Sequence, residues 1–214
     1  MQQLKELLIA GGVVMVPLLG FSIAVIALAI ERAFFWYRVQ RRQHRVIQDA
    51  LELYKQDPSL AIEKLKRNLD LPVARIYLEA ISLEDATPDE FRLALDGAIQ
   101  AELPLLKRFN PIFETVVGLA PLLGLLGTIL GLIRSFGSLN LGEIGGTKTL
   151  GVTAGISEAL VATATGLIVA VIALIIGNTF RAFYQRQLGL VEEYSVQLEL
   201  LHRRSRKVLE PSYA

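Results

Sequence analysis

Three long apolar stretches constrain this chain more than any other feature of its sequence. Residues 7–30 and 115–133 contain no charged side chain, and residues 149–180 contain only Glu158. The hydrocarbon core of a bilayer is about 30 Å thick, and a helix of roughly 20 apolar residues crosses it. Hydrophobic residues make up 52% of the chain, more than the roughly 45–50% of soluble domains. The stretches therefore predict three membrane-spanning helices and exclude an ordinary soluble enzyme.

The distribution of lysine and arginine predicts which way the chain crosses the membrane. Of the 22 basic residues, 13 lie in residues 31–114 and six in residues 181–214, which leaves only Lys5, Arg134 and Lys148 elsewhere. Basic residues near the ends of spanning helices favour the cytoplasmic side of the membrane. We therefore expect the N-terminus outside and both basic regions in the cytoplasm.

These expectations describe an all-α integral membrane protein, because no strand-like alternation of polar and apolar residues persists. The third spanning helix is expected to continue into a tail, whose basic cluster at 203–207 either contacts anionic membrane lipid or is solvated. The predicted segments are a short outer N-terminus with the first spanning helix (1–30), a cytoplasmic helical domain (31–114), the second spanning helix (115–136), a short periplasmic loop (137–149), the third spanning helix (150–180) and the cytoplasmic tail (181–214).

Proline positions predict where helices begin in the cytoplasmic domain. The Asp-Pro pair at 57–58 predicts a helix start with the aspartate as N-cap. The sequence Thr-Pro-Asp-Glu at 87–90 predicts a stronger start, because its glutamate completes a capping box. We expect the last helix of the domain to run toward the second span, with kinks at Pro104 and Pro111.

Glu158 is the most informative residue in the chain. A charged side chain at the centre of a spanning helix costs roughly 2.5–3.5 kcal/mol on insertion scales. Such a residue normally faces protein or water and marks an ion or proton path. If residues 149–180 are centred in the membrane, Glu158 lies ~10 Å outward of the midplane. The alternative is a side chain that extends to the outer interface, or one that hydrogen-bonds a neighbouring helix purely for packing.

Hydroxyl groups accompany this carboxyl on two of the predicted spans. Thr128 lies on the second span, and Thr163 and Thr165 lie on the third. At about 100° per residue, Thr165 shares the face of Glu158, whereas Thr163 lies about 140° away. One straight helix therefore cannot aim both Glu158 and Thr163 fully at one lumen. The three threonines are candidates for an ion pathway, although a hydrogen bond to its own helix explains each one equally well alone.

Small residues recur along the second and third spans. Faces of this kind let membrane helices approach one another closely, and packing within the chain or between copies would explain them. Three helices cannot enclose a pore, so an ion pathway through Glu158 requires several copies of the chain. The candidate packing residues are Gly124, Gly127, Gly131, Ala162, Gly166 and Ala170.

Other kinds of chemistry find no support in the composition. The chain has no cysteine, and its two histidines, His44 and His202, lie outside the predicted spans, which excludes a thiolate or histidine-rich metal centre. A net charge of +1 gives no argument for nucleic-acid binding. The sequence shows no Ser/His/Asp set and no phosphate-binding loop. We therefore expect a protein that is not an enzyme and has no cofactor.

Two motifs resemble those of the MotA/TolQ/ExbB proton-channel family. One is A-P-L-L-G-L-L-G-T at residues 120–128, and the other is G-I-S-E-A-L-V-A-T-A-T-G-L at residues 155–167. Their order, the short outer loop between them and the three-span layout resemble the ExbB/TolQ branch. The flagellar MotA branch fits less well, because its members have four spans. The resemblance extends over essentially the whole chain.

This resemblance implies an inner-membrane motor subunit that converts proton flow into mechanical work. It implies a homo-pentamer around ExbD/TolR-like single-span partners that each supply an aspartate, with a TonB- or TolA-like protein transmitting the motion. By position, Thr128, Glu158 and Thr163 correspond to pathway residues of the family, whereas Thr165 is not part of the shared pattern. Ile172 stands where the family often has a proline, so the third helix is expected to be straighter.

Several roles stay open within and beyond this class. The ExbB role in TonB-dependent transport, the TolQ role in envelope integrity and a gliding-type motor are not separated by any residue named above. A passive membrane scaffold that stabilises a single-span partner is an alternative of a different class, in which Glu158 makes only a packing hydrogen bond. The resemblance favours protons, but threonine oxygens would also suit sodium.

Overall fold

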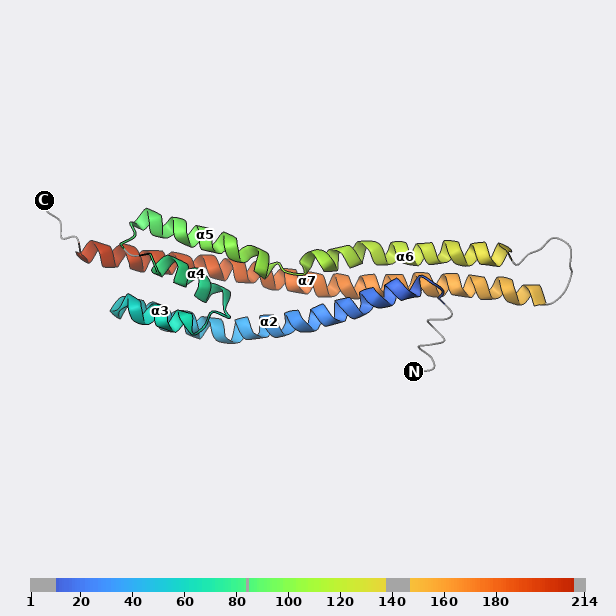
Figure 1. Cartoon of the computed structure of the whole chain (residues 1–214), viewed down its shortest axis with the longest axis horizontal. Coiled ribbons are helices and arrows are strands. Elements are labelled where there is room, and N and C mark those ends of the chain that lie inside the picture. Colours follow the sequence, from blue (N-terminus) through green and yellow to red (C-terminus); the bar gives the residue numbers. More distant parts are fainter. Residues whose placement is uncertain (1–10, 84, 138–146, 210–214) are drawn as a thin grey trace. The chain divides into compact units, whose positions relative to one another are not determined.

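A computed structural model describes residues 11–83, 85–137 and 147–209 of the chain (Figure 1). Every regular element within these residues is an α-helix, and three stretches of helix are long and apolar enough to cross a membrane. The predicted all-α class and the predicted number of spans are therefore confirmed. The helices are α2 (Met15–Gln56), α3 (Pro58–Lys66), α4 (Pro72–Ile81), α5 (Pro88–Leu106), α6 (Asn110–Gly137) and α7 (Thr147–Leu209).

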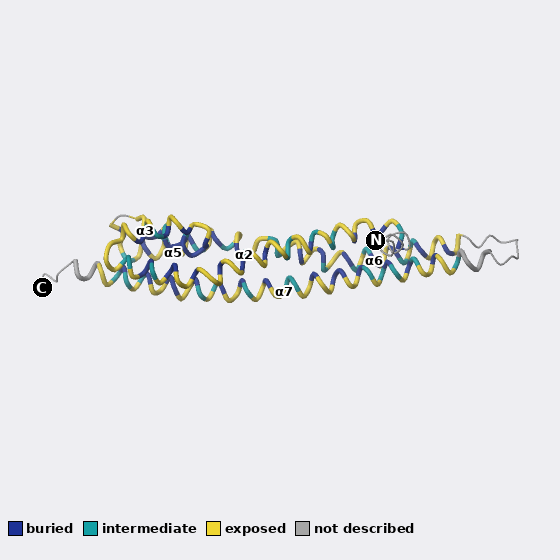
Figure 2. The backbone as a smooth tube through the Cα atoms, turned by 90° about the horizontal axis from the view of Figure 1, so that it is seen from below, coloured by how far each residue is buried: buried dark blue, intermediate teal, exposed yellow. Residues whose placement is uncertain are grey.

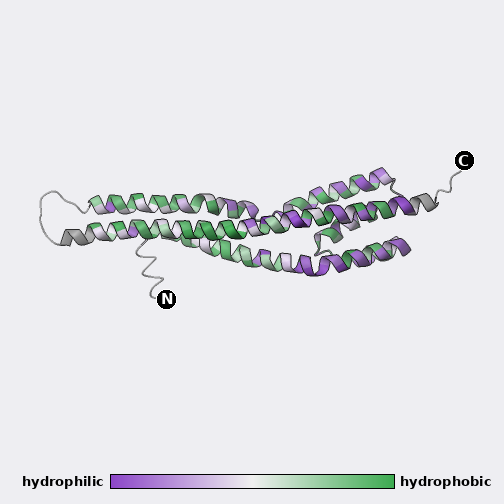
Figure 3. Cartoon of the chain, turned by 180° about the vertical axis from the view of Figure 1, so that it is seen from behind, coloured by the Kyte–Doolittle hydropathy of each residue, from purple (hydrophilic) through white to green (hydrophobic). Residues whose placement is uncertain are grey.

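The described chain divides into two compact units, and each is considered on its own. The apolar unit comprises residues 11–31 and 109–180, and the charged unit comprises residues 32–108 and 181–209. Helices α2 and α7 contribute residues to both units. In Figure 3, hydrophobic residues dominate α6 and the part of α7 in the apolar unit, whereas hydrophilic residues are frequent along the rest of α7.

Helix α2 carries most of the described part of the first apolar stretch. The stretch begins at residue 7 of the sequence, and α2 begins at Met15, after a turn that includes Gly12. Residues 1–10 lie outside the described residues. Gly12 has a φ of +70°, a left-handed conformation that glycine adopts without the steric cost a Cβ atom would bring. From Met15 the helix continues without interruption to Gln56.

The helix starts predicted in the charged unit are confirmed. Asp57 is the N-cap of α3, and its side chain accepts a hydrogen bond from the backbone N–H of Ser59 at 2.8 Å. Thr87 is the N-cap of α5, and its capping box with Glu90 is fully formed. Both starts depend on side chains within three residues of the cap, which is why the local sequence predicts them.

Large side chains form the core of the charged unit. Tyr77, Phe91 and Leu198 come from α4, α5 and α7, and none of them is more than 1% exposed. The hydroxyl of Tyr77 donates a hydrogen bond to the backbone oxygen of Tyr194 at 2.6 Å. Burial raises the pKa of Tyr77, because the phenolate would lose its hydration. In Figure 2, buried residues gather where the helices of this unit face one another.

The last helix of the charged unit does not continue into the second span with kinks at Pro104 and Pro111. Instead, α5 ends at Leu106, α6 begins at Asn110, and Phe109 between them has a φ of +71°. Pro104 lies inside α5. Pro111 lies in the first turn of α6, where a helix does not need the N–H that proline lacks. The second proline therefore starts a helix rather than bending one.

Arg32 of α2 donates to backbone oxygens at the end of α5 and just after it. Its guanidinium donates to the backbone oxygen of Leu105 at 3.2 Å and to the backbone oxygen of Arg108. The last carbonyls of a helix have no partner within the helix, and a buried cation needs hydrogen-bond acceptors. Arg32 is only 2% exposed, so these two backbone oxygens supply acceptors that the buried cation needs.

The third apolar stretch continues as helix into the tail, as predicted, because α7 runs for 63 residues from Thr147 to Leu209. Within the basic cluster of the tail, Arg203 forms an ion pair with Glu199 at 2.8 Å and lies 3.9 Å from the carboxylate of Asp89. One arginine of that cluster is therefore engaged by carboxylates of the protein itself. Most of the predicted loop at 137–149 lies outside the described residues.

Candidate ion-pathway site

Glu158 forms an ion pair with Arg134 inside the apolar unit. Glu158 lies on α7, Arg134 lies in the last turn of α6, and the guanidinium Nη1 of Arg134 donates to Oε1 of Glu158. The side chain of Glu158 is 19% exposed and that of Arg134 is 51% exposed. An unpaired carboxylate in a spanning helix is costly. The ion pair gives this one a cation from the same chain.

The turn before α2 approaches the same ion pair. A Cβ atom added to Gly12 would collide with Oε1 of Glu158 and lie 3.2 Å from Nη1 of Arg134. The φ of +70° at Gly12 also disfavours any side chain. Glycine is therefore required twice at this position, by its backbone conformation and by the space around it. Three elements meet at Glu158: α6, α7 and the turn before α2.

Small residues allow α6 and α7 to pack with their backbones close together. Gly124, Gly127 and Gly131 of α6 are buried, and a Cβ atom at each of them would meet α7. At Gly131 that atom would lie 2.7 Å from the backbone oxygen of Gly155, and at Gly124 it would lie 3.1 Å from the backbone oxygen of Ala162. The glycines of α6 therefore have no room for side chains.

The small residues predicted on α7 are also buried. Ala162 is 0% exposed, Ala170 is 7% exposed, and Gly166 is buried. A Cβ atom added to Gly166 would lie 2.5 Å from the backbone oxygen of Ala120. Ala162 and Gly166 therefore lie at the contact between α6 and α7 of a single chain, where packing within the chain already explains their size.

The three candidate threonines all donate to backbone oxygens. Two of these bonds lie within one helix, and the third joins α7 to α6. A hydroxyl oxygen that donates one hydrogen bond can still accept others, so each threonine remains able to bind water. The bonds are Thr128 to Leu125 (2.6 Å), Thr165 to Val161 (2.8 Å) and Thr163 to Gly124 (3.1 Å).

The structure does not bring Glu158 and the threonines into one hydrogen-bonded cluster. Among the described residues, the carboxylate of Glu158 bonds to Arg134, whereas the three candidate threonines donate to backbone oxygens. The α6 partners of Glu158 and Thr163 are Arg134 and Gly124, which are ~15 Å apart along the helix. An ion path that joins them must therefore include water or groups from other chains.

Sequence reasoning did not single out Arg134 and Gly12 as parts of the site. A signal for Arg134 was present, because it is the only basic residue between 115 and 147 and it follows the second apolar stretch directly. It served only to predict the orientation of the chain. Gly12 gives no such signal, because its contact with Glu158 depends on tertiary packing.

Comparison with known proteins agrees with the arrangement of helices and motifs. Residues 63–193 match the family described as the MotA/TolQ/ExbB proton channel family. The matched region is more than half of the chain. It contains Glu158, Thr128, Thr163 and Thr165, together with the glycines of the α6–α7 contact.

Individual relatives cover most of the chain. The Synechocystis sp. protein named ExbB-like 3 is 59% identical over 195 residues, which is 91% of this chain and 93% of the relative. The ExbB-like 1 protein of the same organism is 36% identical over 94% of this chain and 80% of its own length. The Tol-Pal system protein TolQ of Pseudomonas aeruginosa is 31% identical over 73% of this chain and 69% of its own length. This multi-pass membrane protein therefore belongs to the MotA/TolQ/ExbB proton channel family.

Proposed function

We propose that this chain is the channel subunit of an ExbB/ExbD-type motor in the bacterial inner membrane. The motor couples the proton gradient to TonB-dependent transport across the outer membrane. Membership of the proton channel family supports the channel, and the ExbB-like relatives support this branch. The observation that carries the proposal is Glu158, the single charged residue in the apolar stretch 149–180. The chain is proposed to direct ion flow and motion rather than to catalyse a bond-making reaction.

The proposed orientation follows from the basic residues. The N-terminus lies outside, and residues 31–114 and 181–214 lie in the cytoplasm, because 19 of the 22 lysines and arginines are in those two regions. Arg134 then lies near the outer membrane surface. The Glu158–Arg134 ion pair belongs to the outer half of the membrane, on the side from which protons enter down their gradient.

The apolar unit leaves most of its surface available to other chains or to lipid. Over the apolar part of the first, second and third spanning helices, only 17%, 28% and 33% of the residues, respectively, are buried within the chain. A path beside Glu158 needs walls on all sides, which one chain does not supply. We propose a homo-oligomer, a pentamer as the family resemblance implies. It would surround an ExbD/TolR-like partner that supplies an aspartate and would drive a TonB-like protein.

Protonation of Glu158 would weaken its ion pair with Arg134. A carboxylate and a guanidinium form a charge-assisted hydrogen bond, which is roughly twice as strong as a neutral one. A proton added to Glu158 removes the negative charge and weakens this bond. The contact between α6, α7 and the turn before α2 then loosens. Proton passage is thereby linked to movement of helices at one end of the apolar unit.

The substitution Glu158→Gln tests the proposal, because it keeps the size of the side chain and removes its charge. The wild type and the variant are each expressed with the neighbouring ExbD-like gene, co-purified in detergent and compared in gradient-driven uptake. We expect normal assembly and loss of uptake. Uptake that survives in an intact complex would show that Glu158 is structural. A second pair, Thr163→Val with Thr179→Val as its control, tests a hydroxyl. Thr163 donates to Gly124 of α6, whereas Thr179 donates at 2.8 Å within its own helix, so the control removes a hydroxyl of α7 without removing a bond to α6.

A passive scaffold is the second candidate, because two observations favour packing roles. The Glu158–Arg134 ion pair and the Thr163–Gly124 hydrogen bond both join helices of a single chain. A scaffold predicts that Glu158→Gln keeps both assembly and activity. The motor predicts that Glu158→Gln and Arg134→Gln each lower uptake per assembled complex.

The TolQ role is a further candidate within the family, favoured by the relative named TolQ. Deletion of the gene in its own host separates the two roles. The ExbB role predicts loss of nutrient uptake through the outer membrane with an intact envelope. The TolQ role predicts leakage and sensitivity to detergent with uptake preserved.

A further inference from the structure

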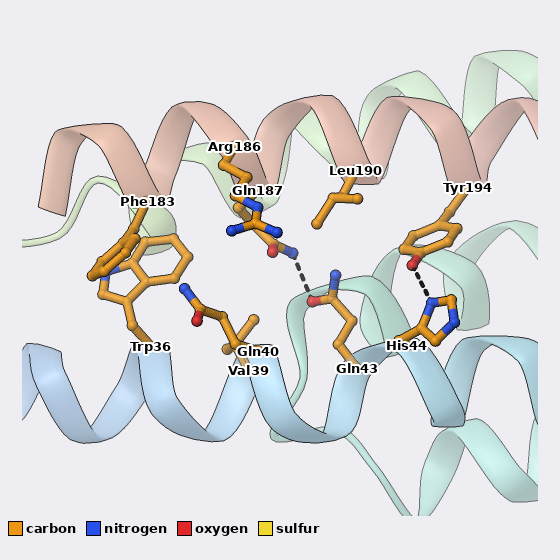
Figure 4. Close-up of a pocket in the computed structure, with 10 residues that line it drawn as sticks. All are labelled: Trp36, Val39, Gln40, Gln43, His44, Phe183, Arg186, Gln187, Leu190 and Tyr194. Atoms are coloured by element: carbon orange, nitrogen blue, oxygen red, sulfur yellow. Dashed lines mark hydrogen bonds between the residues drawn. The ribbon is translucent and has the colours of Figure 1, made fainter. Parts of the chain in front are cut away.

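A cavity of about 320 Å³ lies between α2 and α7 within the charged unit (Figure 4). The rings of Trp36 and Phe183, with centroids 6.0 Å apart, close one end. At the other end, Nδ1 of His44 and the hydroxyl of Tyr194 share a hydrogen bond of 2.8 Å. Ligand pockets range from roughly 300 to 1,000 Å³. The volume therefore suits a small chemical group rather than a large cofactor.

Nitrogen donors face this cavity, and none of the side chains that line it is acidic. Gln187 and Gln43 satisfy one another, because Nε2 of Gln187 donates to Oε1 of Gln43 at 2.6 Å. Figure 4 shows the guanidinium of Arg186 and the amide of Gln40 pointing into the space between the helices. Within the part of the chain that the structure describes, neither side chain forms an ion pair or a hydrogen bond. Their donors are available to a ligand.

The sequence on both sides of the cavity is basic. Residues 32–48 contain five arginines, residues 181–191 contain two, and neither segment contains Asp or Glu. Some of these arginines are already engaged: Arg42 pairs with Asp70 at 2.7 Å, and Arg41 donates to a tyrosine hydroxyl at 2.6 Å. Arg186 is the arginine among the residues lining the cavity. An available cation without a nearby acid favours an anionic ligand.

We propose that this cavity binds the phosphate group of an anionic ligand, with Arg186 as the charged donor and Gln40 as a neutral donor. The planar guanidinium of arginine matches the oxygens of a phosphate in a bidentate arrangement. The rings of Trp36 and Phe183 provide an apolar surface beside the phosphate for the carbon atoms attached to it. The proposal concerns the charged unit alone and does not depend on the role of Glu158.

A phospholipid headgroup and a phosphate compound in solution share this chemistry. Trp36 follows the first apolar stretch by six residues and Phe183 follows the third by three, which is ~9 Å and ~5 Å of helix. The headgroup region extends about 5–8 Å beyond the hydrocarbon core, and basic pockets beside spanning helices bind anionic headgroups. With the proposed spans, the aromatic end of the cavity lies close to headgroup depth. We therefore expect an anionic phospholipid.

Native mass spectrometry of the full-length protein in a maltoside detergent tests the site. Phosphatidylglycerol and phosphatidylcholine are added in parallel, and inorganic phosphate is added as a competitor. The wild type is expected to retain one phosphatidylglycerol per chain in preference to phosphatidylcholine. We expect Arg186→Gln to weaken this binding about tenfold, because it removes a charge-assisted hydrogen bond. Arg186→Lys should retain part of the affinity.

The matched control is Arg38→Gln, which removes an arginine that does not line the cavity but lies at a similar distance from its own apolar stretch. Displacement of the lipid by inorganic phosphate, lost in Arg186→Gln, identifies a phosphate compound from solution. Binding of the lipid alone identifies a headgroup. Either result supports the site. Equal binding of the two lipids without phosphate binding, or equal loss in Arg186→Gln and Arg38→Gln, overturns it.

Discussion

The two units of this chain are both helical, but different contacts hold them together. In the charged unit, large side chains fill the space between helices, and Tyr77 and Phe91 are almost completely buried. In the apolar unit, glycines bring α6 and α7 so close that a Cβ atom at Gly131 would lie 2.7 Å from the backbone oxygen of Gly155. The hydrophobic effect that stabilises the charged unit in water gives little reason for helices to associate in lipid. In the apolar unit, close packing of the α6 and α7 backbones holds the helices together instead.

This difference predicts opposite sensitivities in the two units. Removal of volume should destabilise the charged unit, whereas addition of volume should destabilise the apolar unit. The single tryptophan of the chain, Trp36, belongs to the charged unit and is 3% exposed. Its fluorescence therefore reports unfolding of the charged unit, and circular dichroism reports the helices of both.

The largest effect is expected from Phe91→Ala in the charged unit. Phe91 is 1% exposed and stacks on the ring of His202, with centroids 4.0 Å apart. Loss of a buried phenylalanine costs about 3–5 kcal/mol, because a cavity remains. The tryptophan transition in urea should move to a much lower concentration. Leu93→Ala is the control, because Leu93 is 73% exposed and its loss should change little. Similar shifts for the two variants would contradict the proposed core.

The next effect is expected from Gly131→Leu in the apolar unit. The added side chain meets the backbone of α7 at Gly155 and cannot be accommodated by a rotamer change alone. Overpacking of this kind costs typically 1–3 kcal/mol and more against backbone. Monodisperse protein in detergent should decrease strongly in yield. Gly118→Leu is the control on the same helix, because nothing lies within 4 Å of a Cβ atom there. Equal yields of the two variants would argue against close packing of α6 on α7.

Gly12→Ala tests the meeting of the turn before α2 with the Glu158–Arg134 ion pair. A non-glycine residue at a φ of +70° costs of order 1–3 kcal/mol, and the methyl group would also displace the Glu158 carboxylate. We expect a lower thermal midpoint by circular dichroism, with the midpoint of Trp36 fluorescence, which reports the charged unit, unchanged. Gly20→Ala on α2 has open space and should be neutral or stabilising, because alanine favours helix. A Gly12→Ala variant as stable as Gly20→Ala would show that the turn does not depend on glycine.

Local sequence predicts the parts of this molecule that local contacts determine. The apolar stretches predict the three spanning helices, and the caps at Asp57 and Thr87 form within three residues of the helix starts. The break at Phe109 was not predicted, because proline was expected to bend a helix, whereas Pro111 begins one. Proline is compatible with both outcomes. The break after α5 agrees with the contacts of Arg32, which donates to the backbone oxygens of Leu105 and Arg108 across more than 70 residues of sequence.

In the candidate site, too, local sequence predicts some features, and tertiary packing determines the others. The apolar surroundings of Glu158 make it prominent in the sequence, since a charge in a spanning helix has few explanations. Its ion pair with Arg134 joins residues 24 positions apart, and neither helical periodicity nor hydropathy specifies that pairing. At about 100° per residue, Thr165 does lie on the same face of α7 as Glu158. This periodicity does not predict that Thr163 would donate to Gly124 of α6, because that contact depends on how the two helices pack.

The smallest effect is expected from Tyr77→Phe, which removes one buried hydrogen bond from the charged unit and keeps its volume. The loss of the bond from Tyr77 to the backbone oxygen of Tyr194 should cost about 1 kcal/mol at neutral pH. Folding raises the pKa of Tyr77 above its ordinary value of about 10. The stability from the neutral phenol is therefore complete below pH ~10 and is lost as the pH rises further.

The two proteins should consequently converge in alkaline solution. The urea midpoint of Trp36 fluorescence is measured at pH 8 and at about pH 11, above the ordinary pKa of tyrosine. The wild type should lose more stability between the two than Tyr77→Phe, because only the wild type must keep a neutral phenol buried. Tyr37→Phe is the control, since Tyr37 is 61% exposed. An equal alkaline loss in wild type and Tyr77→Phe would show that the phenol is not held in a buried, neutral state. That result would also argue against the buried hydrogen bond from Tyr77 to Tyr194 as a contact that stabilises the charged unit.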